Sequence, residues 1–340
     1  MNSYTSTFRA FRPLLIALAW VVVVEATSEA LLPADLALLE SPLLHMSYRK
    51  PIRPERVNTV AKIALAERMP ADIIQVGEST GLAGIQPELI NPALPGGLKL
   101  LNLSTQLPAE FAGFQAVEEI GLRTHPHAGY VMAVISPLHL GVVTEGFGDD
   151  IAQYYVRFPV WKLLSSLKAR AFIINLVYYH ALSPRSLYTI VGNANNGALS
   201  TYLQDRVAWY QHSGGWAAIS MQQPFKPHTC RLTYDSGLAF DRLLRLYATA
   251  AQHHARLILV LAPVRCTPDE STTTLERDVR RFLTSHSDII APMPLLTVVP
   301  HEWLGDEVHL TPEGSAQYSH ILAEALSHYL PAAGARARRP

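Results

Sequence analysis

Short apolar runs and longer amphipathic stretches alternate along much of the chain. Four runs are typical of buried strands, at 72–76, 98–104, 130–136 and 256–264. Stretches with apolar residues at helical spacing surround them, at 56–69, 108–123, 236–255, 276–286 and 312–330. Because strands that alternate with helices form βαβ units, the pattern predicts an α/β fold with a parallel sheet. Thr311 is expected to cap the last helix, with Pro312 at its first position.

Two regions depart from this alternation. Residues 86–97 are rich in proline and glycine, so we expect a turn there without a helix or strand. Residues 145–225 combine a long amphipathic stretch at 159–182 with segments rich in glycine and asparagine. We interpret 145–225 as an inserted helical cap over the sheet.

The N-terminus has the layout of an export segment. Arg9 and Arg12 precede an apolar run from Pro13 to Val24, and Glu25 follows. The pattern predicts a signal peptide or an uncleaved signal anchor over 1–32. A buried N-terminal helix of a soluble protein is the alternative. Either form of export places the rest of the chain in the cell envelope or outside the cell, and an uncleaved helix would hold it to the membrane.

The remaining boundaries follow from composition. A proline-containing connector is expected at 33–70, the main domain at 71–330, and a disordered basic tail at 331–340. Over the 340 residues, 49% are hydrophobic and 16% charged, which favours a large folded core. Lys+Arg and Asp+Glu both total 28, so nothing indicates a nucleic-acid partner.

The sequence contains two cysteines, Cys230 and Cys266. They do not form a C-x-x-C motif, so a zinc ribbon or a redox-active pair has no support. In an oxidising compartment they could form a disulfide, and two unpaired thiols are the alternative.

A candidate nucleophile follows the first predicted strand. Gly77-Glu78-Ser79-Thr80-Gly81 fits G-x-S-x-G, a pattern that places a serine on a strand-to-helix turn. A serine needs a base to take its proton, and the base needs an orienting acid. Asp306-x-x-His309 supplies both on one loop near the C-terminus. In α/β-hydrolases the acid and the histidine come from separate loops, so this arrangement does not favour that fold.

Gly77-Glu78-Ser79 and Asp306-x-x-His309, in this order, resemble the first and last blocks of the SGNH, or GDSL-type, hydrolase superfamily. The last block is the more specific match, because it continues through Leu310, Pro312 and Gly314. The resemblance implies a flavodoxin-like α/β/α fold in three layers. It also implies a triad of Ser79, His309 and Asp306, without a cofactor or metal. On this interpretation Gly81 is not needed.

The resemblance also implies an oxyanion hole, in which the family uses two backbone N–H groups and an asparagine side chain. The N–H groups would be those of Ser79 and Ser104, although Ser104 stands where the family has glycine. Glu78 replaces the aspartate of the first block, and Leu138 replaces the asparagine of the third. Substitute donors are His139, Asn193, Asn195 and Asn196, and the sequence does not choose among them.

Simpler interpretations exist for each residue. Ser79 could be merely a helix cap, Asp306 could be a turn residue, and His309 could be a surface group. His45, His125, His127 and His139 fit no specific zinc spacing, so loop histidines are expected instead of a metal site.

Two functions follow from these residues. The first is an exported serine esterase or O-acyltransferase that acts on an acylated carbohydrate or lipid of the envelope, as in superfamily members that acetylate exopolysaccharides. The acyl acceptor would be water or a sugar hydroxyl. The second is a non-catalytic relative that serves as an assembly or binding subunit of an envelope polysaccharide system.

Overall fold

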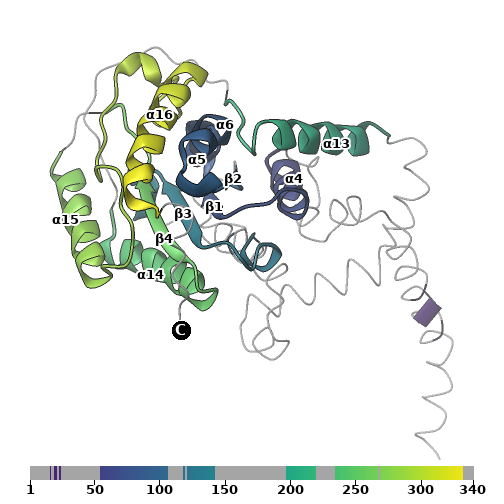
Figure 1. Ribbon diagram of the computed structural model, residues 1–340, viewed down its shortest axis with the longest axis horizontal. Coiled ribbons are helices and arrows are strands. Elements are labelled where there is room, and N and C mark those ends of the chain that lie inside the picture. Colours follow the sequence, from purple (N-terminus) through teal and green to yellow (C-terminus); the bar gives the residue numbers. More distant parts are fainter. Residues whose placement is uncertain are drawn as a thin grey trace, which may run out of the picture. The chain divides into compact units, whose positions relative to one another are not determined.

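Figure 1 shows the computed structural model, which describes residues 54–105, 118, 121–141, 197–219, 234–266 and 269–331, together with Ile16, Ala19, Trp20 and Val23. The chain divides into two compact units. One comprises the described residues within Ala61–Val156 and Arg206–Pro340 and contains the sheet. The other comprises those within Met1–Val60 and Arg157–Asp205.

The sheet has four parallel strands within the described residues, and it confirms the expected α/β class. They are β1 (Ile73–Gly77), β2 (Leu100–Asn102), β3 (Tyr130–Ile135) and β4 (Arg256–Leu261), in the order β2-β1-β3-β4. The strands are buried almost throughout, as expected of a parallel sheet covered on both faces. The order is consistent with a flavodoxin-like fold.

The register brings the carboxyl ends of neighbouring strands to one edge. Ile73 pairs with both Leu100 and Tyr130, and Gly77 pairs with Val134. The residues that directly follow β1, β2 and β3 therefore lie beside one another. In open parallel sheets this edge is where ligands bind, above all where the chain switches from one side of a strand to the other. Here the switch lies between β1 and β3.

Helices flank the strands where the hydrophobic pattern predicted them at 56–69, 236–255, 276–286 and 312–330, with differences at their ends, and the helix predicted at 108–123 lies mostly outside the described residues. Their bounds are α4 (Pro54–Arg68), α5 (Ser79–Gly84), α6 (Pro87–Ile90), α8 (Pro137–Leu140), α13 (Gly197–His212), α14 (Ser236–Gln252), α15 (Glu270–Ser285) and α16 (Pro312–Tyr329), with short 3-10 helices η1 (Asn91–Ala93), η2 (Pro95–Gly97) and η3 (His301–Trp303).

Capping explains where the last two helices begin. The Thr311 hydroxyl accepts the N–H of Gly314 at 3.0 Å, with Pro312 in the first turn of α16, as predicted. Helix α15 begins six residues before the predicted 276–286, because Asp269 forms a capping box with Thr272. The expectation of no element at 86–97 was wrong. Pro87 begins α6, and the buried Ile90 packs it into the core.

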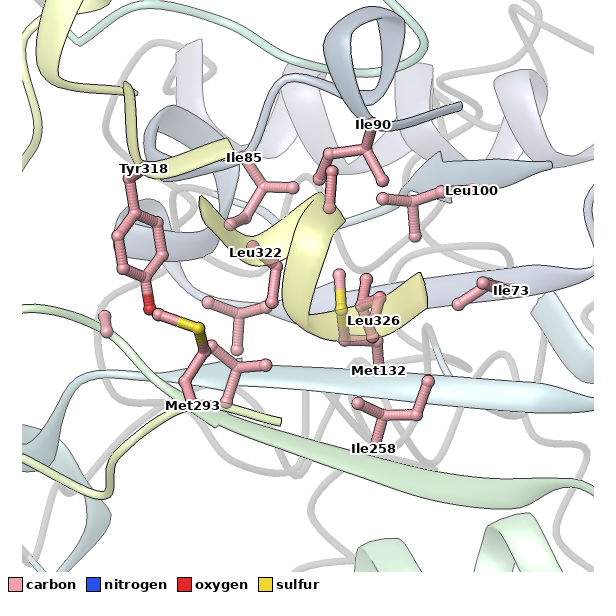
Figure 2. Close-up of a cluster of buried hydrophobic side chains, with 14 of the residues drawn as sticks. Ile73, Ile85, Ile90, Leu100, Met132, Ile258, Met293, Tyr318, Leu322 and Leu326 are labelled. Atoms are coloured by element: carbon pink, nitrogen blue, oxygen red, sulfur yellow. The ribbon is translucent and has the colours of Figure 1, made fainter. Parts of the chain in front are cut away.

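Helix α16 covers one face of the sheet. Figure 2 shows Leu326 of this helix over Met132 and Ile258 of β3 and β4, while Tyr318, one turn or more earlier in the same helix, lies beside Met293. The intervening strand residues point to the opposite face, since strand side chains alternate. Helix α14 contacts β3 and β4 without joining this cluster, so it covers that other face.

Several predicted features fall largely outside the described residues. Of the predicted export segment at 1–32, the structure describes four residues only. It describes the connector at 33–70 from residue 54 onward, and the proposed cap at 145–225 only at 197–219. Asn193, Asn195, Asn196 and most of the tail also lie outside them. Among the helices that the structure describes, none is long and apolar enough to cross a bilayer.

Cys266 is buried and disulfide-bonded. The other cysteine of the sequence, Cys230, lies outside the described residues.

Candidate active site

Ser79 is the first residue of α5, at the carboxyl end of β1. The turn before it depends on Gly77. A Cβ at this position would lie 2.1 Å from the carbonyl oxygen of Val134 on β3, and the φ angle is +159°. Only glycine lets β1 approach β3 this closely while the chain turns into α5.

The three residues of the predicted triad form one continuous chain of contacts. His309 Nε2 lies 2.7 Å from Ser79 Oγ, and His309 Nδ1 lies 2.7 Å from Asp306 Oδ2. Ser79 and His309 are 230 residues apart in the sequence, so the fold alone brings them together. The geometry suits a serine activated by a histidine that an acid orients.

Asp306 is held by the loop that carries it. Its Oδ1 accepts the backbone N–H groups of Val308 at 2.9 Å and His309 at 2.8 Å. Burial acts to raise the pKa of Asp306. The hydrogen bonds from the His309 ring and these two N–H groups outweigh it, so the pKa lies below its ordinary value. Asp306 is therefore a carboxylate at neutral pH and can accept a hydrogen bond from the Nδ1–H of His309.

A buried polar network that was not predicted from the sequence connects α5 to β1 and β2. Gln75 Nε2 donates to Gly81 O at 2.8 Å and to Ser104 Oγ at 2.9 Å. Asn102 Nδ2 donates to Gly81 O at 3.0 Å and to Ile85 O at 3.1 Å. The available signal was a glutamine and an asparagine within strands that are otherwise apolar and fully buried.

Gly81 is part of this support, although the SGNH resemblance does not require a glycine at that position. A Cβ on Gly81 would lie 2.8 Å from Ser104 Oγ and 3.1 Å from Val134 Cβ. The second glycine of G-x-S-x-G is needed here because α5 packs directly on Val134 of β3 and on Ser104, which follows β2.

The two predicted oxyanion donors, Ser79 and Ser104, differ in the hydrogen bonding of their backbone N–H groups. Ser79 is in the first turn of α5, where backbone N–H groups have no partner within the helix. The N–H of Ser104 donates to Asn102 Oδ1 at 3.0 Å. Service to a substrate oxygen would require this bond to be exchanged, so the oxyanion role of Ser104 stays a prediction.

Leu138, which the predicted resemblance aligns with an asparagine, packs its side chain against the apolar pair Val264 and Cys266. The next residue, His139, makes a polar contact instead. Its Nδ1 lies 2.5 Å from Glu78 Oε2.

Glu78 is the second departure from the superfamily pattern, and its carboxylate is fully buried. Besides the His139 ring, it accepts the Ser136 N–H at 2.6 Å and the Thr80 hydroxyl at 3.3 Å, both on Oε1. The hydrogen bond to Glu78 raises the pKa of His139, whereas burial and the Arg242 guanidinium act to lower it. The sequence analysis named both residues without expecting them to pair.

The other histidines of the sequence give no sign of a metal centre within the described residues. No group of three or more histidine, cysteine, aspartate or glutamate side chains is placed there to hold an ion. Both ring nitrogens of His125 contact backbone carbonyls, of Gly121 at 3.0 Å and Met69 at 2.6 Å. His45 lies outside the described residues.

A groove of about 410 Å³ lies between α14 and α15, lined in part by Tyr234, Phe240 and Phe282. None of the three triad residues lines it. We therefore place the candidate site at the carboxyl edge of the sheet.

Comparison with known proteins gives no family for this chain: no family model matches the sequence, and no curated protein matches it either.

Proposed function

We propose that this protein is an exported serine ester hydrolase or O-acyltransferase of the SGNH type. The single observation that carries the proposal is the chain Ser79 Oγ–His309 Nε2 and His309 Nδ1–Asp306 Oδ2, with 2.7 Å at each contact. The position of Ser79 after β1, at the sheet edge where parallel α/β proteins bind ligands, supports the same proposal.

In the proposed reaction Ser79 Oγ attacks the carbonyl carbon of an ester, and the serine proton passes to His309 Nε2. The carbonyl oxygen becomes an oxyanion. When the intermediate collapses, the ester C–O bond breaks, and the leaving alkoxide takes the proton from His309. Water or a sugar hydroxyl then attacks the acyl-enzyme, with His309 again as base and then acid, and Ser79 is restored.

Asp306 would act through His309. A carboxylate at Nδ1 keeps the proton on that nitrogen, so Nε2 presents its lone pair to the serine. It also stabilises the imidazolium that forms once His309 has taken the proton. The depressed pKa of Asp306 suits this role, because the acid stays ionised throughout.

The cell envelope or the outside of the cell remains our proposal for location. The disulfide at Cys266 supports it, because stable disulfides are rare in the cytosol. The export segment at 1–32 would provide the route. An acylated carbohydrate or lipid of the envelope is then the substrate we propose.

The described end of the proposed cap contacts the helix that carries the nucleophile. Trp216 Nε1 donates to Ala83 O at 2.8 Å, and Ala217 N–H donates to Leu82 O at 3.4 Å. These contacts join residues 216 and 217 to the C-terminal half of α5, and Ser79 is at the opposite end of that helix.

The proposal is tested with a fluorophosphonate probe and intact-protein mass spectrometry. Ser79 Oγ should bond to phosphorus as fluoride leaves, with the serine proton taken by His309. The added mass should be lost in Ser79→Ala and His309→Ala, and kept in Ser236→Ala, which removes an exposed hydroxyl at the start of α14.

Absence of labelling at Ser79 with several probes would favour the second function, a non-catalytic assembly or binding subunit. Two observations favour this second function: the N–H of Ser104 already donates to Asn102, and Leu138 packs in an apolar cluster.

A further inference from the structure

Glu78 departs from the SGNH pattern that the sequence resembles, and it is in contact with His139, the residue after the other departure, Leu138. The carboxylate lies one residue before Ser79, and the imidazole lies at the end of the segment that follows β3. Because β1 and β3 are adjacent and in register, both residues occupy the β1/β3 switch point of the sheet. Ser79 directly follows Glu78 in the chain, so the Glu78–His139 contact lies next to the residue that contacts His309.

We propose that His139, held by Glu78, donates from Nε2 to the oxyanion formed when Ser79 attacks its substrate, in place of the absent asparagine. This inference rests on the proposed function, because it needs an oxyanion at Ser79. Glu78 is the positioning residue of the pair, and His139 is the group that touches the reacting oxygen.

Burial and hydrogen bonding fix the carboxylate. Glu78 is 0% exposed, and Ser136 N–H and Thr80 Oγ occupy its Oε1. Only Oε2 is left for the His139 ring, at 2.5 Å. The imidazole is 32% exposed, so one part of it is covered by Glu78 while another part reaches solvent.

The backbone of His139 is fixed from the other face of the sheet. Arg242 of α14 donates from Nη1 to the carbonyl oxygens of His139 at 2.8 Å and Leu140 at 3.0 Å. Leu138 packs in its apolar cluster beside them. The ring is thus positioned both by Glu78 and by the segment that carries it, as a preorganised donor requires.

The protonation of the ring decides whether Nε2 can donate. If Nδ1–H donates a hydrogen bond to the Glu78 carboxylate, a neutral ring has only a lone pair at Nε2. The imidazolium presents N–H there as well. Glu78 and Arg242 are the charged groups that act on His139. The bond to Glu78 raises its pKa, while burial and the Arg242 charge oppose the rise.

This gives a definite pH dependence. A raised pKa keeps the Nε2 proton in place to higher pH than in a free histidine, and the donor is lost as pH rises through that pKa. The rate of Ser79 modification should therefore fall as pH rises through the pKa of His139.

The experiment measures the second-order rate of fluorophosphonate addition to Ser79 in the full chain, from about pH 5 to 10. We expect His139→Ala to lower the rate by ~10²–10³-fold. His139→Gln keeps an amide donor that does not titrate, so it should retain part of the rate and lose the fall at high pH.

Glu78→Gln should move that fall to lower pH by about one unit or more, because the ring loses its anionic partner. Glu78→Asp should partly restore its position. His320→Gln, at an exposed site on α16, is the matched control and should leave the profile unchanged. Thermal melting establishes which variants fold. If the buried Glu78 variants do not, the His139 variants decide the question.

The inference is overturned if His139→Ala reacts within threefold of wild type, or if His139→Gln keeps the fall at high pH, while Ser79 is labelled normally. If wild-type Ser79 takes no probe at all, the proposed function fails first, and the pair has no oxyanion to serve. The two failures are therefore distinguishable.

Discussion

Asp306 shows how a single side chain can have two separable tasks. One oxygen accepts two backbone N–H groups and shapes the loop, and the other orients the His309 ring. A substitution that preserves the first oxygen and changes the second should separate catalysis from folding.

Asp306→Asn is that substitution. Its amide oxygen can still accept from Val308 and His309, but its NH₂ would face Nδ1–H. The ring should change tautomer, so that Nε2 carries a proton and can no longer take one from Ser79. We expect the rate of Ser79 phosphonylation to fall by ~10²–10⁴-fold, with the thermal midpoint nearly unchanged. A rate within threefold of wild type would contradict the triad.

Tyr318 is a residue whose polar atom the fold does not use. It is 1% exposed, and its hydroxyl has no hydrogen-bond partner among the described residues. Burial raises the pKa of this phenol, so it is neutral in the folded protein.

Tyr318→Phe should therefore leave the free energy of unfolding unchanged or increase it by ~1 kcal/mol, because an unsatisfied buried hydroxyl is removed. Urea denaturation measures this. Leu322→Ala, in the same core cluster, is the contrasting variant and should cost ~2–5 kcal/mol. A loss of more than 1 kcal/mol in Tyr318→Phe would mean that the hydroxyl has a stabilising partner.

Helix α5 packs closely against the residues around it, and its two glycines, Gly81 and Gly84, differ in the space that they have. A Cβ on Gly81 would lie 2.8 Å from Ser104 Oγ, whereas one on Gly84 would meet only Leu310 Cδ1, at 3.5 Å. The first contact is too close and the second is ordinary.

Gly81→Ala should lower the free energy of unfolding by ~1–3 kcal/mol through overpacking, and should also slow modification of Ser79. Gly84→Ala, in the same helix, should be neutral or stabilising by up to ~1 kcal/mol, since alanine favours helix over glycine. Denaturation and fluorophosphonate rates measure both effects. Equal effects from the two variants would show that helix propensity, and not the contact with Ser104, governs this element.

The sequence was sufficient to predict which segments are strands and which are helices in most cases, but it predicted the ends of these elements less well. The four strands were recognisable because a strand buried on both faces is a continuous apolar run. Thr311 and Pro312 marked the start of α16 by their own chemistry. Helix α6 was missed because its proline and glycine neighbours are turn formers. Its helical state depends on the burial of Ile90 in the core, which no local pattern reveals.

For the molecule as a whole, the disulfide at Cys266 provides a covalent constraint beside the carboxyl edge of β4. Cys266 is 1% exposed and packs with Val264. Such a bond stabilises a fold mainly by restricting the unfolded chain.

Reduction should therefore destabilise the protein by ~2–4 kcal/mol and lower its melting temperature by several degrees. Calorimetry with and without dithiothreitol measures the change. Cys266→Ser should melt at the lower temperature under both conditions. A wild-type melting temperature that does not respond to full reduction, verified by thiol titration, would show that the bond contributes nothing to stability.

The candidate site could be predicted in part. Ser79, Asp306 and His309 were predicted because a serine nucleophile needs a base and an orienting acid, and because their order resembles the first and last blocks of SGNH hydrolases. The Glu78–His139 pair was not, because nothing local indicates that a glutamate after one strand will meet a histidine after another. Similarly, the bond from Ser104 N–H to Asn102 Oδ1 depends on how the chain turns after β2.

The sequence by itself determined the class of fold, the cap of the last helix and the three residues of the candidate triad, since periodicity, capping and residue chemistry are local properties. Only the tertiary structure decided which side chains meet at the carboxyl edge of the sheet. Those contacts depend on the register of β1 against β2 and β3, on the close approach at Gly77 and Gly81, and on burial of the Glu78 carboxylate. These are relations between segments far apart in the chain, and packing establishes them.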